Sequence, residues 1–493
     1  MSLILAIDQG TSSSRGIVFD LAAGRILGEG QREFACRFPR DGWVEQDPEA
    51  VWNTTLSACR KAIDNAGATG SDIKAIGITN QRETTLVWDR RTGACVHDAI
   101  VWQDRRTADR CERLRSDGLE NHVKASTGLV ADPYFSATKL AWLLDSDPAL
   151  RSRAAAGELC FGTIDTFLLW RLTGGRSHLT DATNASRTML FDIRRQAWDE
   201  ELLRYFDISP EMLPEVRDSA ADFGVTDESW FGAPIPVTGI AGDQQAALVG
   251  QGCFAEGACK VTCGTGCFAV TNTGGRMLNS SSGLLSTVGY RIAGETTYAL
   301  EGSVFVAGAA IKWLRDTLGI IASAAETEYL ARETGATTHG VYVVPAFTGL
   351  GAPWWNPDAR GTITGLTLDS TRGHIVTATL QSVAYQTAEL LEAMAGDGAA
   401  VDRLRVDGGM AVNDWLCQFM ADMLNVPVER PPFVETTALG AATLAGFGAG
   451  LTASLHERDW GLDRSFAPEM PNERRHALLD GWRTAVRQTL AGT

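Results

Sequence analysis

Several familiar signatures are missing from this chain of 493 residues. It contains neither the phosphate-binding loop G-x-x-x-x-G-K-[ST] nor the dinucleotide fingerprint G-x-G-x-x-G, so the two commonest nucleotide-binding folds are disfavoured. Its seven histidines are dispersed and its ten cysteines form no C-x-x-C pair, which argues against a zinc or redox motif. Acidic residues outnumber basic ones by 60 to 44, and the net charge of −16 argues against non-specific binding of nucleic acid.

Long apolar runs are also scarce. The first run ends at Asp8 and has no basic leader, so we expect no signal peptide. Residues 436–455 carry no charge, but they are rich in glycine, alanine and threonine, which favours a buried helix and turn over a membrane span. We expect no stable membrane association and a cytoplasmic protein, whose cysteines (Cys95, Cys160 and Cys253 among them) act as small buried apolar residues.

A phosphate-cradle pattern, by contrast, occurs twice, about half the chain apart. Residues 3–20 form an apolar run that ends in Asp8, a turn of glycine and hydroxyl residues, and a second apolar run. Residues 259–270 repeat this layout around a Gly-Thr-Gly turn, and both copies predict a β-hairpin. One such turn alone is usually an ordinary hairpin loop. Two of them, one with a carboxylate at the strand end, indicate a site that grips the polyphosphate of ATP from both sides.

Strand-like and helical stretches alternate along the chain, which predicts the α/β class. We expect strands at 73–78, 85–88, 235–240, 340–347 and 404–406, and helices at 138–144, at 374–394 and from about 413. The helix at 138–144 should be amphipathic. The length is enough for two large domains. We place their boundary near residue 250, so that residues 1–250 hold the first hairpin and residues 251–493 the second.

These hairpins and several further motifs resemble the FGGY carbohydrate kinase family, in the actin/Hsp70/sugar-kinase superfamily. The resemblance runs from Leu3 to about Trp482. Its motifs are residues 8–15, 77–85, 132–136, 239–245, 264–268, 361–381 and 405–409. Within the family, residues 80–83 and 132–134 are closest to the glycerol kinases. The resemblance implies two actin-like (ribonuclease H-like) domains around a catalytic cleft, and phosphorylation of glycerol to sn-glycerol 3-phosphate with ATP and Mg²⁺.

The same resemblance assigns residues to the substrate. A three-carbon polyol needs hydrogen bonds at each oxygen and apolar cover for its carbons. The hydrogen-bonding groups are expected from Arg82, Glu83, Tyr134, Asp243 and Gln244, and the apolar cover from Trp102 and Phe268. Taken singly, Arg82 and Glu83 would be a surface ion pair, and the two aromatic residues plain core. Their motif context favours the substrate site.

Catalysis and ATP binding are assigned in the same way. Asp243, which follows a strand and opens a helix, is expected to be the general base that accepts the hydroxyl proton late in a loose phosphoryl-transfer transition state. Asp8, with Asp243, is expected to organise Mg²⁺. The phosphate-binding residues would be Thr11, Ser12, Ser13, Arg15 and Thr265, and the nucleoside-binding residues Gly308, Lys312, Gly409 and Asn413. Lys312 departs from the glutamine that is common in glycerol kinases, and we expect it to be solvated.

The sequence lacks the residues that two known modes of regulation would need. Residues 225–236 contain two acids and no basic residue, and no histidine lies between His178 and His339. Inhibition by fructose 1,6-bisphosphate and activation by histidine phosphorylation, both known in the family, are therefore expected to be absent, whereas a homodimer or homotetramer is expected. Three alternatives stay open: a kinase for another small polyol or ketose, an Hsp70-like ATPase switch, and a filament-forming relative.

Overall fold

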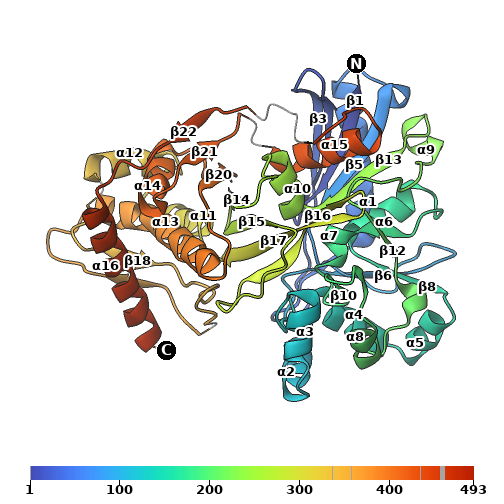
Figure 1. The fold of residues 1–493 in the computed structure, drawn as a ribbon, viewed down its shortest axis with the longest axis horizontal. Coiled ribbons are helices and arrows are strands. Elements are labelled where there is room, and N and C mark those ends of the chain that lie inside the picture. The colour runs from blue at the N-terminus through green and yellow to red at the C-terminus, as the bar shows by residue number, and fades with distance from the viewer. Residues whose placement is uncertain (1, 336, 357, 433–434, 456–460, 493) are drawn as a thin grey trace.

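Two mixed β-sheets organise the chain (Figure 1). The computed structural model describes residues 2–335, 337–356, 358–432, 435–455 and 461–492. Within these residues, the strands of the first sheet are, in order, β13 (Val237–Gly242), β5 (Ile73–Asn80), β1 (Leu3–Gln9), β2 (Ser13–Asp20) and β3 (Arg25–Glu33). Those of the second sheet are β16 (Leu285–Ile292), β17 (Glu295–Val304), β15 (Cys267–Gly274), β14 (Ala258–Cys263), β20 (Arg403–Asp407), β21 (Val428–Arg430) and β22 (Arg464–Phe466).

The two sheets share one topology. In the first, β1 pairs antiparallel with β2 and parallel with β5, which pairs parallel with β13. In the second, β14 pairs antiparallel with β15 and parallel with β20, which pairs parallel with β21. Both predicted hairpins are therefore confirmed, and each one supplies the first two strands of its sheet in sequence order. The predicted α/β class is confirmed as well.

Short strand pairs and helices surround the sheets. The two-stranded sheets among the described residues are β4 (Glu45–Gln46) with β7 (Ala99–Ile100), β6 (Leu86–Asp89) with β8 (Leu159–Gly162), β9 (Leu179–Asp181) with β12 (Glu215–Arg217), β10 (Phe191–Asp192) with β11 (Ala197–Trp198), and β18 (Tyr342–Val344) with β19 (Thr362–Thr364). The helices are α1 (Pro48–Asn65), α2 (Ala108–Ser116), α3 (Glu120–Thr127), α4 (Ser136–Asp145), α5 (Pro148–Ala155), α6 (Ile164–Leu172), α7 (Ala182–Ala185), α8 (Glu200–Tyr205), α9 (Glu228–Phe231), α10 (Asp243–Gly250), α11 (Gly308–Asp316), α12 (Glu326–Thr334), α13 (Arg372–Gly396), α14 (Asp414–Leu424), α15 (Thr436–Gly448) and α16 (Asn472–Ala491).

Both faces of the first sheet are covered, which explains why β1 is apolar throughout. Leu5 and Ile7 belong to the core formed with α1, whereas Ile4 and Ala6 belong to the core formed with α15. Successive strand residues point to opposite faces, so a strand buried on both sides loses the alternation of polar and apolar residues. The core of the second half is built mainly around the long helix α13.

Helix α15 comes from the second half of the sequence but packs on the sheet of the first half. It contacts β13, β5 and β1, and it crosses α10 (Figure 1). Glycine allows this approach, because a Cβ at Gly77 would clash with the backbone of Ala441, and one at Gly440 with the backbone of Ala246. The prediction of a buried helix at the start of residues 436–455 is confirmed.

The other predicted elements are found with two differences. The strand expected at 340–347 is only three residues long, Tyr342–Val344. The helix expected at 138–144 is present as α4. Its polar residues Thr138 and Lys139 are buried together with the apolar ones, so they do not form the solvent-exposed face that an amphipathic helix would have. No helix in the described ranges has the length and apolar content needed to cross a membrane.

The cysteines are free thiols. Cys160 and Cys253 are buried as expected, but Cys95 is partly exposed, so the prediction for this residue is wrong. Cys95 lies in an isolated bridge to Trp88, outside the longer strands, and packs against the first core without being fully buried.

Candidate active site

Three of the predicted site residues follow parallel strands of the first sheet. Asp8 lies near the end of β1, Arg82 follows β5, and Asp243 is the first residue of α10, directly after β13. The carboxyl ends of parallel strands meet at one edge of a sheet, which is where open α/β sheets bind ligands. The fold therefore brings two carboxylates and a guanidinium group to the same edge.

Arg82 is the centre of a buried cluster of ion pairs. Its two terminal nitrogens donate to the two carboxylate oxygens of Glu301, at 2.6 and 3.0 Å. Its Nε lies 3.2 Å from Oδ1 of Asp243. Both Arg82 and Glu301 are almost completely buried, so little water screens this bidentate pair. Arg82 comes from the first half of the sequence and Glu301, on β17, from the second.

A second arginine extends the cluster. Nε of Arg187 donates to Oε1 of Glu83 at 2.7 Å, and its Nη2 donates to Oε1 of Glu301 at 3.1 Å. Opposite charges therefore alternate from Asp243 through Arg82, Glu301 and Arg187 to Glu83. We call these five residues the charge chain. Its two ends are the carboxylates that the sequence assigned to the substrate.

The ionisation of the charge chain follows from its own contacts. Burial raises the pKa of Glu301, but the charges of Arg187 and Arg82 outweigh burial and lower this pKa to about 2. At Glu83, burial raises the pKa and the two arginines offset only part of the effect. Arg187 and Glu301 were not among the residues predicted from the sequence. The available signal was Glu301 itself, a single acid in an apolar stretch of β17.

Asp243 is the most exposed member of the charge chain. Its side chain is 33% exposed, whereas the side chains of Arg82, Glu83, Arg187 and Glu301 are at most 2% exposed. As the first residue of α10, it lies at the positive end of the helix dipole, where a carboxylate is stabilised. A partly exposed carboxylate held by a fixed guanidinium group can accept a proton from a bound hydroxyl.

Lys260, which the sequence analysis also missed, approaches the site from the second sheet. Its ammonium group contacts Oε1 of Gln244 and donates to Oγ1 of Thr262 at 3.0 Å. Burial lowers the pKa of Lys260, and the carboxylates of Asp407 and Asp243 act in the opposite direction. Gln244 is predicted to bind the substrate, and its side-chain oxygen is already bound by a lysine.

The predicted aromatic residues lie on both sides of the site. The rings of Trp102 and Tyr134 contact edge to face at 5.6 Å, and Tyr134 accepts from Arg82 at 3.5 Å. Phe268, on β15, is directly opposite Ser303, and its strand neighbour Val270 is opposite Glu301. Cross-strand partners and alternate residues share a face. Phe268 therefore lies on the same face of the second sheet as Glu301.

The first phosphate turn connects β1 and β2. The Gly10 amide donates to the carbonyl of Ser13 at 2.9 Å, which closes the turn, and Ser12 is exposed. The hydroxyl of Thr11 accepts from the indole of Trp102 at 3.0 Å. Arg15, at the far side of the turn, pairs with Glu435 at 2.5 Å. This turn thus links the predicted phosphate residues to Trp102, which is predicted to cover the substrate.

The second phosphate turn lies against the starts of α11 and α14. The amides of Ala307 and Gly308 donate to the carbonyls of Thr265 and Gly264, at 2.9 and 3.0 Å. A Cβ at Gly408 would clash with the backbone of Cys263, so the segment that contains Gly409 also reaches this turn. These amides at the start of α11 are therefore already bound, and what the turn offers a phosphate is the close backbone approach that its glycines allow.

Asn413 and Lys312, two of the residues predicted to bind the nucleoside, lie at the start of α14 and in α11. Asn413 is the N-cap of α14, where its Oδ1 accepts from the amide of Leu416 at 2.9 Å, so this side chain has a structural role of its own. Lys312 lies on α11, one turn after Gly308, and is exposed. Its position agrees with a solvated lysine near the second phosphate turn.

A divalent cation fits the first turn by charge. Burial, together with the carboxylates of Glu435 and Asp243, raises the pKa of Asp8 to about 7, although Arg15 opposes the rise. Among the described residues, no three His, Cys, Asp or Glu side chains are grouped to hold a metal by themselves. Mg²⁺ commonly uses one or two carboxylates, water and substrate phosphates. The carboxylates of Asp8 and Asp243 suit such a site.

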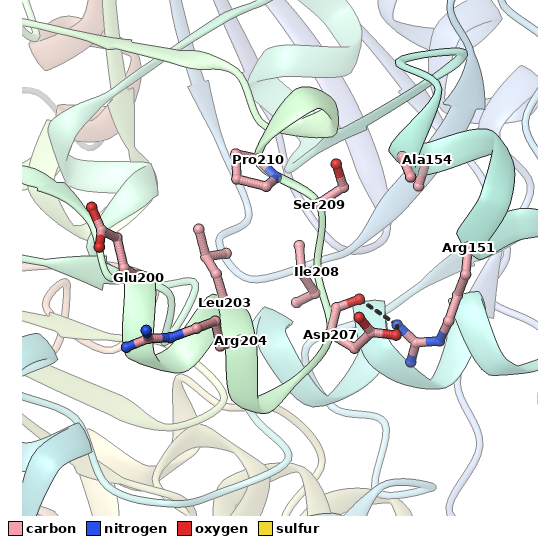
Figure 2. Close-up of a pocket in the computed structure, with 10 residues that line it drawn as sticks. Arg151, Ala154, Glu200, Leu203, Arg204, Asp207, Ile208, Ser209 and Pro210 are labelled. Carbon is pink, nitrogen blue, oxygen red and sulfur yellow. Dashed lines mark hydrogen bonds and ion pairs between the residues drawn. The ribbon is translucent and has the colours of Figure 1, made fainter.

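A separate hollow of about 410 Å³ lies between α5 and α8. It is lined by apolar residues such as Leu203, Ile208 and Pro210, and Arg151 at its edge is paired with Asp207 (Figure 2). None of the predicted site residues lines it. We therefore assign it no part in the site.

Comparison with known proteins identifies the family. The chain matches the N-terminal domain of the FGGY family of carbohydrate kinases over residues 3–250 and the C-terminal domain over residues 259–449. It belongs to the FGGY carbohydrate kinases. Among curated relatives in this family, "Glycerol kinase" of Alcanivorax borkumensis is 60% identical over 489 residues, which cover 99% of this chain and 98% of that one. "Glycerol kinase 1" of Pseudomonas aeruginosa is 59% identical over 487 residues, 98% of each chain.

Solved structures of FGGY kinases agree with this membership. The glycerol kinase of Plasmodium falciparum, solved with ADP, has a TM-score of 0.94 and 36% identity and covers 99% of this chain and 98% of that one. A xylulose kinase from Lactobacillus acidophilus has a TM-score of 0.89 at 20% identity, covering 100% of this chain and 99% of that one, and shows the shared fold alone. The expected two-domain α/β kinase fold is confirmed.

The charge chain predicts the effect of removing Asp243, the residue expected to be the general base. In Asp243→Asn the amide keeps the shape of the side chain but is a very poor proton acceptor, so kcat should fall at least about 100-fold while ATP still binds. Steady-state kinetics and ATP titration would measure the two effects. Asp227→Asn, which changes the surface N-cap of α9, is the matched control and should retain normal kcat. A value of kcat in Asp243→Asn above roughly a third of wild type would remove Asp243 from the mechanism.

The exposure of Lys312 predicts a small effect at the nucleotide side. A long exposed lysine can turn into water at little cost. Lys312→Gln should therefore change KM for ATP by less than about twofold, because screened surface charges contribute little. The comparison is a titration of ATP at saturating glycerol for the two proteins. A tenfold or larger rise in KM would show that this ammonium group binds a phosphate.

Proposed function

We propose that this chain phosphorylates glycerol, transferring the γ-phosphoryl group of ATP to give sn-glycerol 3-phosphate and ADP. The observation that carries the proposal is the 60% identity, over nearly the whole chain, with a relative named glycerol kinase. The site agrees with it, because the charge chain ends in two carboxylates beside a wall of Tyr134 and Trp102. Such a site can pair each hydroxyl of a small neutral polyol and cover its carbons.

Substrate binding would use the groups nearest Asp243. Glu301 holds the guanidinium group of Arg82 in place, and Arg82 in turn donates to the hydroxyl of Tyr134. Both groups are therefore oriented before a ligand binds. Glu83, fixed by Arg187, would accept from a second hydroxyl group. Because these polar groups are already oriented, binding requires little ordering of side chains. Phe268 would cover the carbon chain from the side of the second sheet, while Gln244 would act through its contact with Lys260.

ATP would lie along the two phosphate turns. Thr11, Ser12, Ser13 and Arg15 in the first turn and Thr265 in the second would bind the phosphates. Gly308, Gly409 and Asn413, with Lys312 at the edge, would border the nucleoside. Mg²⁺, held by Asp8 and Asp243 with water and phosphate oxygens, would neutralise charge on the transferred group.

The transfer itself would proceed in one step. The hydroxyl oxygen of glycerol attacks the γ-phosphorus as the bond to the leaving β-phosphate oxygen breaks. Phosphoryl transfer passes through a loose transition state, so the hydroxyl proton leaves late. Asp243 accepts that proton, and Arg82 holds the carboxylate in place. The carboxylate is ready before the substrate arrives, because its ion pair is already formed.

Three further proposals concern the setting of the enzyme. Free cysteines, most of them buried, agree with a reducing cytoplasm, and the relatives named glycerol kinase support a role in glycerol metabolism. The acidic net charge of −16 agrees with the absence of nucleic acid as a partner. We also propose a homodimer or homotetramer, as is common in the family. Membership of the FGGY kinase family argues against an Hsp70-like ATPase switch and against a filament-forming protein. The remaining alternative, a kinase for another small polyol or ketose, is tested by measuring activity with a panel of such substrates.

Glycerol should control ATP turnover. Since the charge chain joins the two halves, the substrate that binds beside it should complete the site, and basal hydrolysis of ATP should be far slower than the kinase rate. A coupled assay of ADP release at fixed ATP, with and without glycerol and then with other polyols and ketoses, measures this. Equal ADP release with and without glycerol would contradict the proposal, and a clear preference for another substrate would reassign the reaction.

The segment 225–236 bears on regulation. It forms α9 and a bridge between Val225 and Pro236. Two arginines from elsewhere do reach it: Arg60 donates to the carbonyl of Trp230 at 2.9 Å, and Arg176 to the carbonyl of Val225 at 3.2 Å. Both are thus bound to the backbone of the segment. A bisphosphate would need several free guanidinium groups here.

We therefore predict no control by fructose 1,6-bisphosphate. The expected result is unchanged kinase activity when the bisphosphate is raised to millimolar levels at low ionic strength, where weak electrostatic binding is strongest. Sodium sulfate at matched ionic strength controls for screening. Saturable inhibition by the bisphosphate alone would reveal an effector site made of other residues. Activation by histidine phosphorylation is likewise not expected.

A further inference from the structure

Lys139 is a completely buried lysine whose position breaks two general preferences. It lies in the first turns of α4, which begins at Ser136, and none of it is exposed. Lysine is almost never fully buried unless its charge is paired. A positive charge is also unfavourable near the N-terminus of a helix. Places where several local rules fail together are expected at functional sites.

The ammonium group of Lys139 binds three consecutive carbonyl groups. It donates to the carbonyl oxygens of Pro133, Tyr134 and Phe135, at 2.5, 2.7 and 3.3 Å. Lysine has three N–H donors, so each carbonyl can receive one. These carbonyls precede α4 and belong to the loop that carries Tyr134. The lysine therefore fixes the backbone of this loop from inside the protein.

The first residue of α4, which directly follows this loop, also contacts the turn that contains Glu83. The hydroxyl of Ser136 donates to the carbonyl of Glu83 at 2.9 Å, and the hydroxyl of Thr85 donates to it at 3.0 Å. Glu83 has a φ of 63°, in the left-handed region that residues other than glycine rarely adopt. Such a conformation persists only where its surroundings impose it. The loop bound by Lys139 supplies part of that support.

We propose that Lys139 is a positioning residue for the substrate site: it holds the Tyr134 loop and, through Ser136, the Glu83 turn in the shape that binds glycerol. The inference rests on the proposed function, because it assigns Lys139 to the same site. Lys139 acts on the face that binds the polyol, and the three carbonyls that its ammonium group binds belong to neither phosphate turn. Its loss should therefore weaken glycerol binding and leave ATP binding unchanged.

The proposal also predicts a pH dependence. Burial lowers the pKa of Lys139 to about 8, against the opposing effect of Glu83, Asp104, Asp132 and Cys111. As the pH rises through this value, the group loses one N–H donor and its charge, so its hold on the three carbonyls weakens. Tyr134 does not ionise in this range, because burial raises its pKa well above the usual value. KM for glycerol should therefore rise above about pH 8.

The first experiment compares kinetic constants. In Lys139→Met, which keeps the length of the side chain but donates no hydrogen bond, KM for glycerol should rise about tenfold or more. KM for ATP should stay within about twofold of wild type. Lys139→Arg, which keeps the charge, should recover much of the loss. Lys74→Met, on the exposed side of β5, is the control and should match wild type.

The second experiment remains informative if Lys139→Met does not fold. KM for glycerol is measured from pH 7 to pH 9.5 in wild type and in Lys139→Arg. The expected result is a rise above about pH 8 in wild type only, because arginine stays charged. A flat wild-type profile, or a Lys139→Met protein with normal KM for glycerol, would overturn the role of Lys139 alone. A wild type that does not phosphorylate glycerol would overturn the proposed function as well.

Discussion

The bidentate pair between Arg82 and Glu301 is the contact on which the site depends. It joins a loop of the first sheet to a strand of the second, across 219 positions of sequence. A buried ion pair is not a strong source of stability, because both groups lose their water. Its geometry, however, is specific, and either charge left alone would be costly. The pair therefore fixes how the two halves meet, and Asp243 and Glu83 take their places from it.

The duplication of the sheet explains why ATP and a small polyol can share one site. Each half contributes the same hairpin, with its turn at the same end of a mixed sheet. The first half adds the charged loop after β5, whereas the second adds the glycine turn after β14 and the glycine segment that follows β20. A neutral substrate and a polyphosphate need different partners. Two copies of one topology supply them through different loops, while the strands stay alike.

Local pattern predicted much of this architecture, but not the contacts that complete the site. The hairpins, β5 and α13 follow from runs of neighbouring residues, and Asp243 and Arg82 lie beside strands that the pattern located. Arg187 carries no such local signal, and although Glu301 is an acid in an apolar stretch, the pattern does not reveal its arginine partners, because they are far away in sequence. Lys139 shows the limit differently: a lysine in a helix predicts an exposed face, and only the fold reveals carbonyl groups around it. Periodicity predicts which residues of a helix or strand face the core. It does not predict which charged residues are buried in ion pairs or hydrogen bonds with distant parts of the chain.

The position of α15 has a consequence for how the protein is made. The first sheet is complete in sequence at Gly242, yet one of its faces is covered by a helix that begins only at Thr436. On the ribosome, chains emerge from the N-terminus and domains tend to fold in that order. Here the face of β1, β5 and β13 must stay uncovered while most of the second half is synthesised. The packing of the first half is therefore completed only after α15 has been synthesised. Helix α10, which starts with Asp243, likewise packs against α15 only when translation is nearly over.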